Sequence, residues 1–272
     1  MCTIDCTVTS DRFETFEFDE SSVMERSPID DFATDELHAR LANFGVIAFR
    51  DQFLDDAVLI SLMKRLGTIT FTQGERSVSG FPDLNLVSNV GKANPKSVFH
   101  SDTSYVKETP AYTFLRPVEL PERGGATLFT NQYLAWDRLP IRYQVQLAGV
   151  QALHRVTGLD ESTLDEVESW HPLARRHPRS DRTALYLTTP KRCLRLRDVD
   201  GKPVPGSERM IRMLYRHSIQ KNRIYRHHWQ PGDLVIWDNR CTMHRGEHEG
   251  VIGDRIFHRG MVIDVATSSS TV

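Results

Sequence analysis

Short strand-like segments, each bounded by turn-forming residues, dominate this chain from residue 84 onward and limit the folds that it can adopt. They are rich in β-branched and aromatic residues, and turn sequences such as Gln230-Pro231-Gly232-Asp233 separate them. The predicted strands are LNLVSN at 84, AYTFLRPV at 111, ATLFTN at 126, LARRH at 173, ALYLTT at 184, IYRHHW at 224, LVIWD at 234 and RIFHRGMVI at 255. Many short strands with such turns favour a closed or sandwiched antiparallel architecture, of which a jelly roll is a common form.

Three segments carry apolar residues at helical spacing and are expected to flank the sheets. They run from Thr34 to Gly45, from about Asp56 to Gly67, and from Ser207 to about Ile219. Between the first two, VIAF at 46–49 predicts a buried strand. The expected fold class is therefore mainly β with flanking helices.

Composition is that of an ordinary globular protein, and we expect one domain over residues 1–272. Hydrophobic residues make up 39% of the 272 residues, enough to bury a core without covalent staples. The formal net charge is −2 and no basic block stands out, so neither nucleic acid nor an acidic membrane is implied as a partner. Four scattered cysteines do not form a disulfide framework, and the first 25 residues lack the basic start and apolar run of a secretory signal. These features predict a cytoplasmic protein, with self-association into a homo-oligomer left open.

A histidine and a carboxylate lie two residues apart at His100 and Asp102, so on an extended segment both project from one face. His244 follows the predicted strand LVIWD and could supply a third ligand from across a barrel. Two histidines and one carboxylate on one face are typical of Fe(II) oxygenases, because they leave open positions on the metal. Taken alone, the His-X-Asp pair fits a surface hydrogen-bonding pair as well.

Two arginines in the last predicted strand, Arg255 and Arg259, share one face because they are four residues apart. A guanidinium matches a carboxylate in charge and geometry, so a cosubstrate with a remote carboxylate would suit such a pair. Surface salt bridges are the alternative interpretation.

Together these residues fall within longer motifs that resemble the taurine dioxygenase and 2,4-dichlorophenoxyacetate dioxygenase family of Fe(II)/2-oxoglutarate enzymes. The motifs are FHSDTSYVKETPAY, LPERGGATLFTNQYLAWDRLP, HHWQPGDLVIWDNRCTMHRGE and GDRIFHRGMV, in the family's order and approximate spacing. The resemblance implies a double-stranded β-helix, a jelly roll of the cupin-like kind. The first 25 residues and the segment from Val156 to Trp170 diverge from the family pattern.

The resemblance also implies roles for individual residues. His100, Asp102 and His244 match the iron ligands, and Arg255 matches the arginine that holds the distal carboxylate of 2-oxoglutarate. The remaining matches are Thr127, which would hydrogen-bond to the same carboxylate, Trp237, which would lie beside the cosubstrate or in the core, and Arg259, whose counterpart meets the substrate's anionic group.

The expected reaction uses Fe(II), 2-oxoglutarate and O2 to oxidise a C–H bond of a small anionic molecule, with release of succinate and CO2. Hydroxylation is the default outcome, and desaturation or another tailoring oxidation of specialised metabolism is the alternative. Halogenation is disfavoured because Asp102 is present. Further substrate-binding candidates are Tyr105, Lys96 and Lys191, although each lysine could simply face solvent.

Two other functions remain open on the residues alone. A zinc hydrolase or metal-dependent isomerase on a cupin-like barrel could use the same three ligands, but it would not need Arg255 and Thr127. A non-catalytic β-sandwich protein could use the His and Arg cluster to bind an organic anion. The other histidines, His154 and His171 among them, are interpreted as structural.

Overall fold

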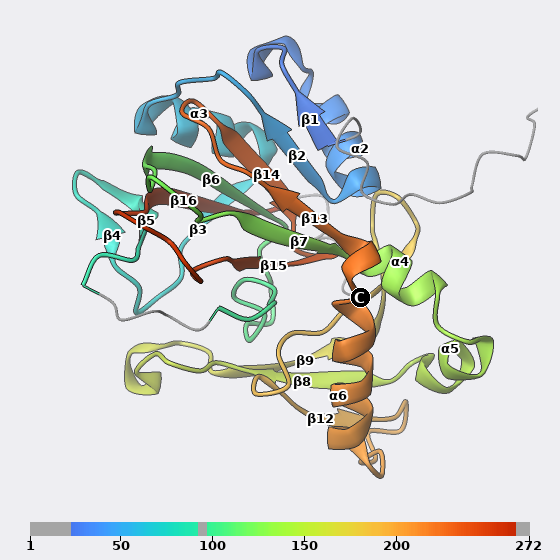
Figure 1. Cartoon of the computed structure of the whole chain (residues 1–272). Helices are drawn as coiled ribbons and strands as arrows, with labels where there is room; N and C mark the ends of the chain where they lie inside the picture. Colours follow the sequence, from blue (N-terminus) through green and yellow to red (C-terminus); the bar gives the residue numbers. More distant parts are fainter. Residues whose placement is uncertain (1–22, 92–96, 265–272) are drawn as a thin grey trace, which may run out of the picture.

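The computed structural model describes residues 23–91 and 97–264, and two antiparallel sheets form its centre (Figure 1). The order of the larger sheet is β1 (Met24–Glu25), β2 (Val46–Phe49), β14 (Leu234–Asp238), β6 (Tyr112–Glu119), β16 (Ile256–Ile263), β5 (Phe81–Ser88) and β4 (Ser77–Val78), with β3 (Thr68–Thr70) also paired to β16. The smaller sheet has the order β13 (Ile224–His227), β7 (Thr127–Asn131) and β15 (Thr242–Gly246). All these strand pairs are antiparallel except β1 with β2.

Side chains of the two sheets meet in a buried interior. Phe129 of β7 and Tyr225 of β13 pack in one cluster with Val235, Trp237 and Phe257 of the larger sheet. Successive residues of a strand point to opposite faces, so the neighbours of these residues lie on the outer face of the larger sheet. The side chains of His100, Asp102 and His244 also project into this interior.

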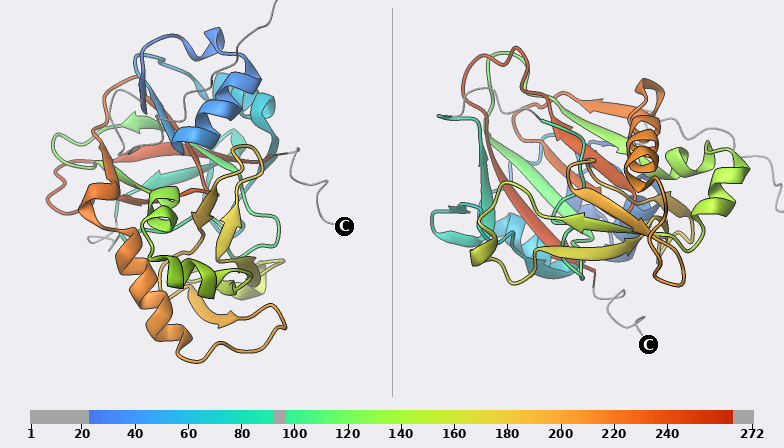
Figure 2. Two further views of the ribbon diagram at one scale, coloured as in Figure 1. Left: turned by 90° about the vertical axis from the view of Figure 1, so that its right-hand side faces the viewer. Right: turned by 90° about the horizontal axis from the view of Figure 1, so that it is seen from below.

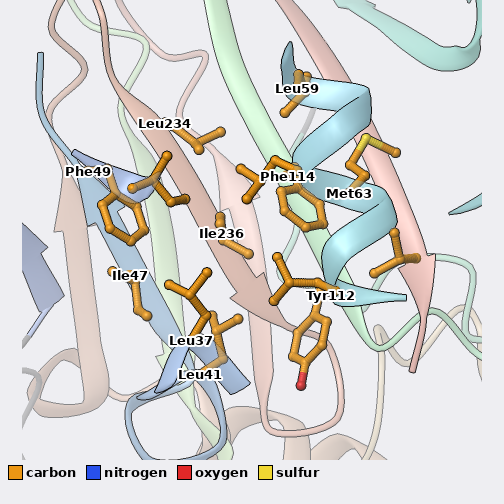
Figure 3. Packing of buried hydrophobic residues seen from close by; sticks show 14 of the residues in the cluster. Leu37, Leu41, Ile47, Phe49, Leu59, Met63, Tyr112, Phe114, Leu234 and Ile236 are labelled. Carbon is orange, nitrogen blue, oxygen red and sulfur yellow. The ribbon is translucent and has the colours of Figure 1, made fainter. Parts of the chain in front are cut away.

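Two helices, α2 (Thr34–Phe44) and α3 (Asp56–Leu66), cover the outer face of the larger sheet (Figure 3). Leu41 and Met63 from the helices are fully buried against Phe114 and Ile236 from the strands. Full burial of such a side chain contributes about 1.5–3 kcal/mol, so this layer is a large share of the core. The first helix ends at Gly45 in a left-handed conformation with φ 76°, which glycine adopts without strain.

A third layer lies below the two central sheets in Figure 1, and Figure 2 shows the same separation from the side. It contains the sheet β12 (Cys193–Arg197), β8 (Gln151–Arg155) and β9 (Glu168–Pro172), the pair β10 (Ala174–Arg176) and β11 (Thr183–Leu185), and the helices α4 (Gln132–Asp137), α5 (Ile141–Leu147) and α6 (Ser207–Ser218). Short 3-10 helices occur at Ile29–Asp31, Glu161–Thr163 and Lys221–Arg223. A second apolar cluster holds this layer together, with Leu214 of α6 packed against the strands.

The predicted strands and helices agree with the structure in most places. The strands at 46–49 and 234–238 have the predicted bounds, and helices occupy the three predicted segments. The strand predicted at 184 is wrong in extent, because β11 ends at Leu185 and residues 186–189 are irregular. The strands β8, β9, β12 and β15 were not predicted, since their polar residues conceal the alternation. Among the described residues, no helix is both long and apolar enough to span a bilayer.

Candidate metal centre

Three side chains, His100, Asp102 and His244, converge in the interior between the sheets. His244 lies in β15, and His100 is bridged to it by two backbone hydrogen bonds of 2.8 and 3.0 Å. Nε2 of His100 lies 3.7 Å and Nε2 of His244 3.8 Å from the same atom, Oδ1 of Asp102. These separations are too long for hydrogen bonds, and they are shorter than twice a ligand distance of about 2.0–2.2 Å, so one ion could contact each nitrogen together with Oδ1.

The two imidazoles are oriented so that Nε2 faces the centre. Nδ1 of His100 lies 2.9 Å from the carbonyl oxygen of Val98, and a hydrogen bond from Nδ1 fixes the ring and leaves Nε2 as the free lone pair. The His244 ring packs 4.6 Å from the Trp237 ring and 4.4 Å from the His100 ring. Within the described ranges, Nδ1 of His244 is buried without a hydrogen-bond partner.

Hydrogen bonds hold the carboxylate of Asp102 from behind. The Thr113 hydroxyl donates to Oδ2 of Asp102 over 2.9 Å and accepts from Nδ2 of Asn239 over 2.8 Å. Oδ1 of Asn239 accepts from the Trp237 indole over 3.0 Å. Trp237 was predicted to lie beside the cosubstrate or in the core. Its side chain is fully buried, and its ring contacts the ring of His244.

The electrostatics of the centre give all three groups the protonation state that a metal needs. Burial lowers the pKa of His244 to about 3 and also lowers the pKa of His100, so both rings are neutral near pH 7. Burial raises the pKa of Asp102, but His244, Arg259, His100 and the Thr113 hydrogen bond together bring it down to about 2. The centre therefore offers two neutral nitrogens and one carboxylate.

A second feature of the interior is the guanidinium of Arg255. Only 3% of this residue is exposed. Its Nε donates to the Gly125 carbonyl over 3.0 Å and its Nη2 to the Thr127 hydroxyl over 3.2 Å. The Trp229 indole also donates to this hydroxyl, over 3.0 Å. Among residues 23–91 and 97–264, Arg255 has no carboxylate partner, and burial lowers its pKa to about 10. A buried cation without a counter-ion is costly, so this pocket favours an added anion.

Arg259, the predicted substrate anchor, contacts two acidic residues. Its Nη1 lies 3.3 Å from Oδ1 of Asp102, and its Nη2 donates to the carboxylate of Glu75. Nη2 also lies within hydrogen-bond distance of Asn85 and Thr72. A salt bridge to an acidic neighbour was the alternative interpretation of Arg259, and a role in substrate binding stays a prediction that requires displacement of Glu75.

The other substrate-binding candidates lie in different environments. Tyr105 is buried close to the charges of Glu75 and Arg259, and burial raises its pKa. Lys191 is exposed, and Lys96 lies outside the described residues. Sequence reasoning did not identify Thr113, Asn239 or Glu75, because no local pattern marks a polar residue whose partner is distant in the chain.

A second group with metal-ligand chemistry, His177, Asp238 and Cys241, is a structural ion-pair network. Asp238 accepts from Arg240 and lies 2.9 Å from Nε2 of His177. Burial raises the pKa of the Cys241 thiol well above its usual value, which keeps it protonated. With Asp238 already neutralised by an arginine, this group has little to offer a cation.

Two histidines and one carboxylate on a strand-lined interior are the arrangement of the mononuclear non-haem iron oxygenases. Comparison with known proteins gives the family. The sequence profile described as "Taurine catabolism dioxygenase TauD, TfdA family" matches residues 12–261, and the chain belongs to this family.

Several characterised proteins are similar to this chain over most of their length. The 2,4-dichlorophenoxyacetate dioxygenase of Burkholderia sp. (strain RASC) is 30% identical over 80% of this chain and 81% of its own. The corresponding enzyme of Cupriavidus pinatubonensis is 28% identical over 85% and 88%. A solved taurine dioxygenase structure from Burkholderia xenovorans superposes with a TM-score of 0.73, at 25% identity, over 88% of this chain and 83% of its own.

The predicted family, jelly-roll fold and activity are thereby confirmed. The chain is an Fe(II)- and 2-oxoglutarate-dependent dioxygenase, an oxidoreductase that acts on a small organic substrate. Neither a zinc hydrolase nor a non-catalytic binding protein is favoured, because the relatives are 2-oxoglutarate-dependent enzymes.

Proposed function

We propose that His100, Asp102 and His244 bind the Fe(II) of this dioxygenase. Support comes from the approach of both Nε2 atoms to within 3.7 and 3.8 Å of one carboxylate oxygen. The protonation states add to this support, because neutral imidazoles and an ionised carboxylate can bind a metal without first releasing a proton. Thr113 and the Val98 carbonyl orient the ligands from outside the centre.

We propose further that Arg255 and Thr127 bind the distal carboxylate of 2-oxoglutarate. The observation that carries this assignment is the buried guanidinium of Arg255, which lacks a carboxylate partner within the described residues. Its Nε is held by the Gly125 carbonyl and its Nη2 lies next to the Thr127 hydroxyl, so the side chain is already oriented before an anion arrives. Contact of Trp237 with the cosubstrate stays a prediction, since its indole is hydrogen-bonded to Asn239.

The proposed reaction is hydroxylation of a C–H bond in a small organic anion. Bound iron, together with 2-oxoglutarate and O2, supplies the oxidising power. The protein's own groups orient the reactants and exclude water. Desaturation requires only another pose of the substrate. An anionic substrate is supported by the names of the relatives, because 2,4-dichlorophenoxyacetate is a carboxylate and taurine carries a sulfonate.

We also retain a single domain over residues 1–272 and a cytoplasmic location as proposals. The lower layer is tied to the upper part of the molecule by Arg175, which donates to the Thr109 hydroxyl over 3.2 Å. Such contacts between layers support one folding unit.

Anaerobic titration with Fe(II) and then 2-oxoglutarate tests the assignment of the site. The wild-type protein is expected to develop the weak visible charge-transfer band of the iron–2-oxoacid chelate. Asp102→Ala should lose the band through loss of the metal, whereas Arg255→Lys should require more 2-oxoglutarate to reach it. A wild-type protein without the band would contradict the assignment.

A further inference from the structure

Arg192 carries a guanidinium that the functional assignments above do not use. It lies just before β12, where its backbone N–H donates to the Thr189 carbonyl over 2.8 Å and its own carbonyl accepts from Arg155 N–H over 2.8 Å. Its Nε donates to the Thr157 hydroxyl over 2.8 Å. Both ends of the residue are therefore fixed. In the part of the chain that the structure describes, its terminal nitrogens have neither a hydrogen-bond nor a salt-bridge partner.

The charge of Arg192 lies close enough to the metal centre to act on its groups. Electrostatic interactions join its charge to Asp102, Glu75 and Tyr105, and also to His100 and His244. The side chain of His100 is 25% exposed, compared with 10% for His244 and 3% for Asp102, so the centre opens on the side of His100. The guanidinium is itself half-buried, and burial lowers its pKa.

Three segments are joined by side-chain hydrogen bonds, and Thr157 at the start of one of them also bonds to Arg192. The loop that carries Glu75 is joined to the 157–166 segment by the Gln73 side chain, which donates to Asp165 over 2.6 Å and accepts from its backbone N–H over 3.0 Å. The backbone N–H of Lys107, two residues after Tyr105, donates to Glu166 over 2.8 Å. Arg192 is bonded to Thr157, at one end of the 157–166 segment. The same network of side-chain hydrogen bonds therefore also holds its guanidinium.

Among the described residues, no carboxylate forms a salt bridge with Arg192, and the acidic groups with which its charge interacts include Asp102 and Glu75. Asp102 and Glu75, the two carboxylates closest to the centre, are both paired with Arg259. Arg255 lies next to Thr127 and is assigned to the cosubstrate. A half-buried guanidinium whose terminal nitrogens have no partner among the described residues is suited to a planar or tetrahedral oxyanion that can accept two hydrogen bonds.

We propose that Arg192 binds the anionic group of the primary substrate, a carboxylate or sulfonate, beside the metal centre. This inference rests on the proposed function, because it assumes that iron and 2-oxoglutarate occupy the interior. It differs from the prediction based on sequence, which assigned the anion to Arg259 and named Tyr105, Lys96 and Lys191 as further substrate-binding candidates. Lys191 is exposed next to Arg192, and Arg259 is engaged by two carboxylates.

The test compares Arg192→Gln with Lys202→Gln, a matched loss of one charge at an exposed lysine that no assignment places near the centre. Wild-type and variant proteins with Fe(II) and 2-oxoglutarate are given carboxylates and sulfonates, including 2,4-dichlorophenoxyacetate and taurine. Binding is followed anaerobically by the shift of the visible band, and turnover is followed by succinate release. For each acid that binds, its uncharged primary amide or sulfonamide is measured beside it.

We expect Arg192→Gln to weaken binding of the acid about ten- to a hundredfold, as for loss of a charge-assisted hydrogen bond. Binding of the uncharged analogue, the affinity for 2-oxoglutarate and the melting temperature should stay near wild type. Lys202→Gln should change none of these quantities, nor the binding of the acid. Arg192→Lys should recover part of the affinity.

Equal losses for acid and uncharged analogue, or no loss for either, would overturn the proposal. It would also be overturned if no acid bound while 2-oxoglutarate still gave the chelate band. Absence of the band itself would instead contradict the proposed function, so the two failures are distinguishable.

Discussion

The hydroxyl of Thr113 donates a hydrogen bond of 2.9 Å to Oδ2 of Asp102, and this leaves Oδ1 as the oxygen that faces both His100 and His244. Thr113 lies on β6 and is itself held by Nδ2 of Asn239. The carboxylate is thus oriented before a metal binds, and the hydroxyl acts on the metal only through Asp102.

Thr113→Val keeps the shape of the side chain and removes the hydroxyl, so it should weaken metal binding about ten- to a hundredfold. Competition with a chromophoric chelator under anaerobic conditions measures the affinity for Fe(II). Thr113→Ser, which keeps the hydroxyl, should stay close to wild type. Equal affinities for the valine variant and the wild type would exclude a positioning role.

Asp102→Ala and His244→Ala are each expected to abolish succinate formation coupled to substrate oxidation, with the fold largely preserved. Circular dichroism and succinate release on one preparation distinguish loss of the site from loss of the fold. Asp102→Glu should be nearly as damaging, because the added methylene would move the carboxylate away from the distance of about 2.0–2.2 Å that a carboxylate ligand needs. Turnover near the wild-type rate in either alanine variant would remove that residue from the ligand set.

Arg255→Lys should raise the KM for 2-oxoglutarate by about ten- to a hundredfold, because lysine keeps the charge and loses the fork that a carboxylate matches. The pKa of Arg255, lowered by burial to about 10, still leaves the guanidinium charged near neutral pH. The wild-type KM should therefore stay constant from pH 7 to 9 and rise only as the pH approaches 10. Arg123→Lys, a change at an exposed arginine, is the control.

The burial of His154 leads to a prediction about how the stability of the folded protein depends on pH. It is buried, its ring stacks on Tyr186 at 5.3 Å, and neither ring nitrogen has a hydrogen-bond partner within the described residues. Burial lowers its pKa well below 6.5, so protonation favours the unfolded chain and stability should fall as the pH drops below about 6.5.

His154→Phe removes this titrating group and two unpaired buried nitrogens, each of which costs about 1–3 kcal/mol. Thermal melts at pH 7 and pH 5 should therefore show a smaller loss of melting temperature for the variant than for the wild type. His228→Gln, at an exposed histidine, should melt like the wild type at both pH values. A loss at pH 5 as large in the phenylalanine variant as in the wild type would contradict the assignment to His154.

The fold was predictable where a strand is a run of apolar residues and a turn-forming residue precedes it. VIAF follows Gly45, and LVIWD follows the Pro231-Gly232 turn, so both strands have the expected bounds. β15 was missed because its sequence, TMHRG, has one large apolar residue, and His244 is there for the site rather than for strand propensity. For the same reason β8, which contains the buried His154, does not resemble a strand in sequence.

Some residues of the site could likewise be predicted from the sequence, and others could not. His100, Asp102 and Arg255 could be found because motifs mark them. Glu75 lies 184 residues from its partner Arg259, and Asn239 lies 126 residues from Thr113, so only the folded chain shows these pairs. Arg192 was missed for a related reason, since a single arginine beside Lys191 has no pattern that distinguishes it from a solvent-facing charge.

Arg259 is the residue on which sequence and structure lead to different expectations. Its guanidinium is buried and paired with Asp102 and Glu75, and its Nε has no partner within the described ranges. Removal of one member of a buried charge pair leaves the other uncompensated and typically costs about 3–5 kcal/mol. Because the Glu75 side chain is 34% exposed and can turn toward solvent, Arg259→Ala should fall at the lower end of that range.

We therefore expect Arg259→Ala to lower the melting temperature. It should also weaken the binding of 2-oxoglutarate and of substrate together, since Asp102 loses the cation that stabilises its ionised form. Glu75→Gln should cost less stability, because the amide can still accept a hydrogen bond from Arg259. The melting temperature and both KM values, measured on one preparation, decide between the roles. An unchanged melting temperature with only the substrate KM raised would show instead that the substrate's anion displaces Glu75 and binds Arg259, as the sequence resemblance implied.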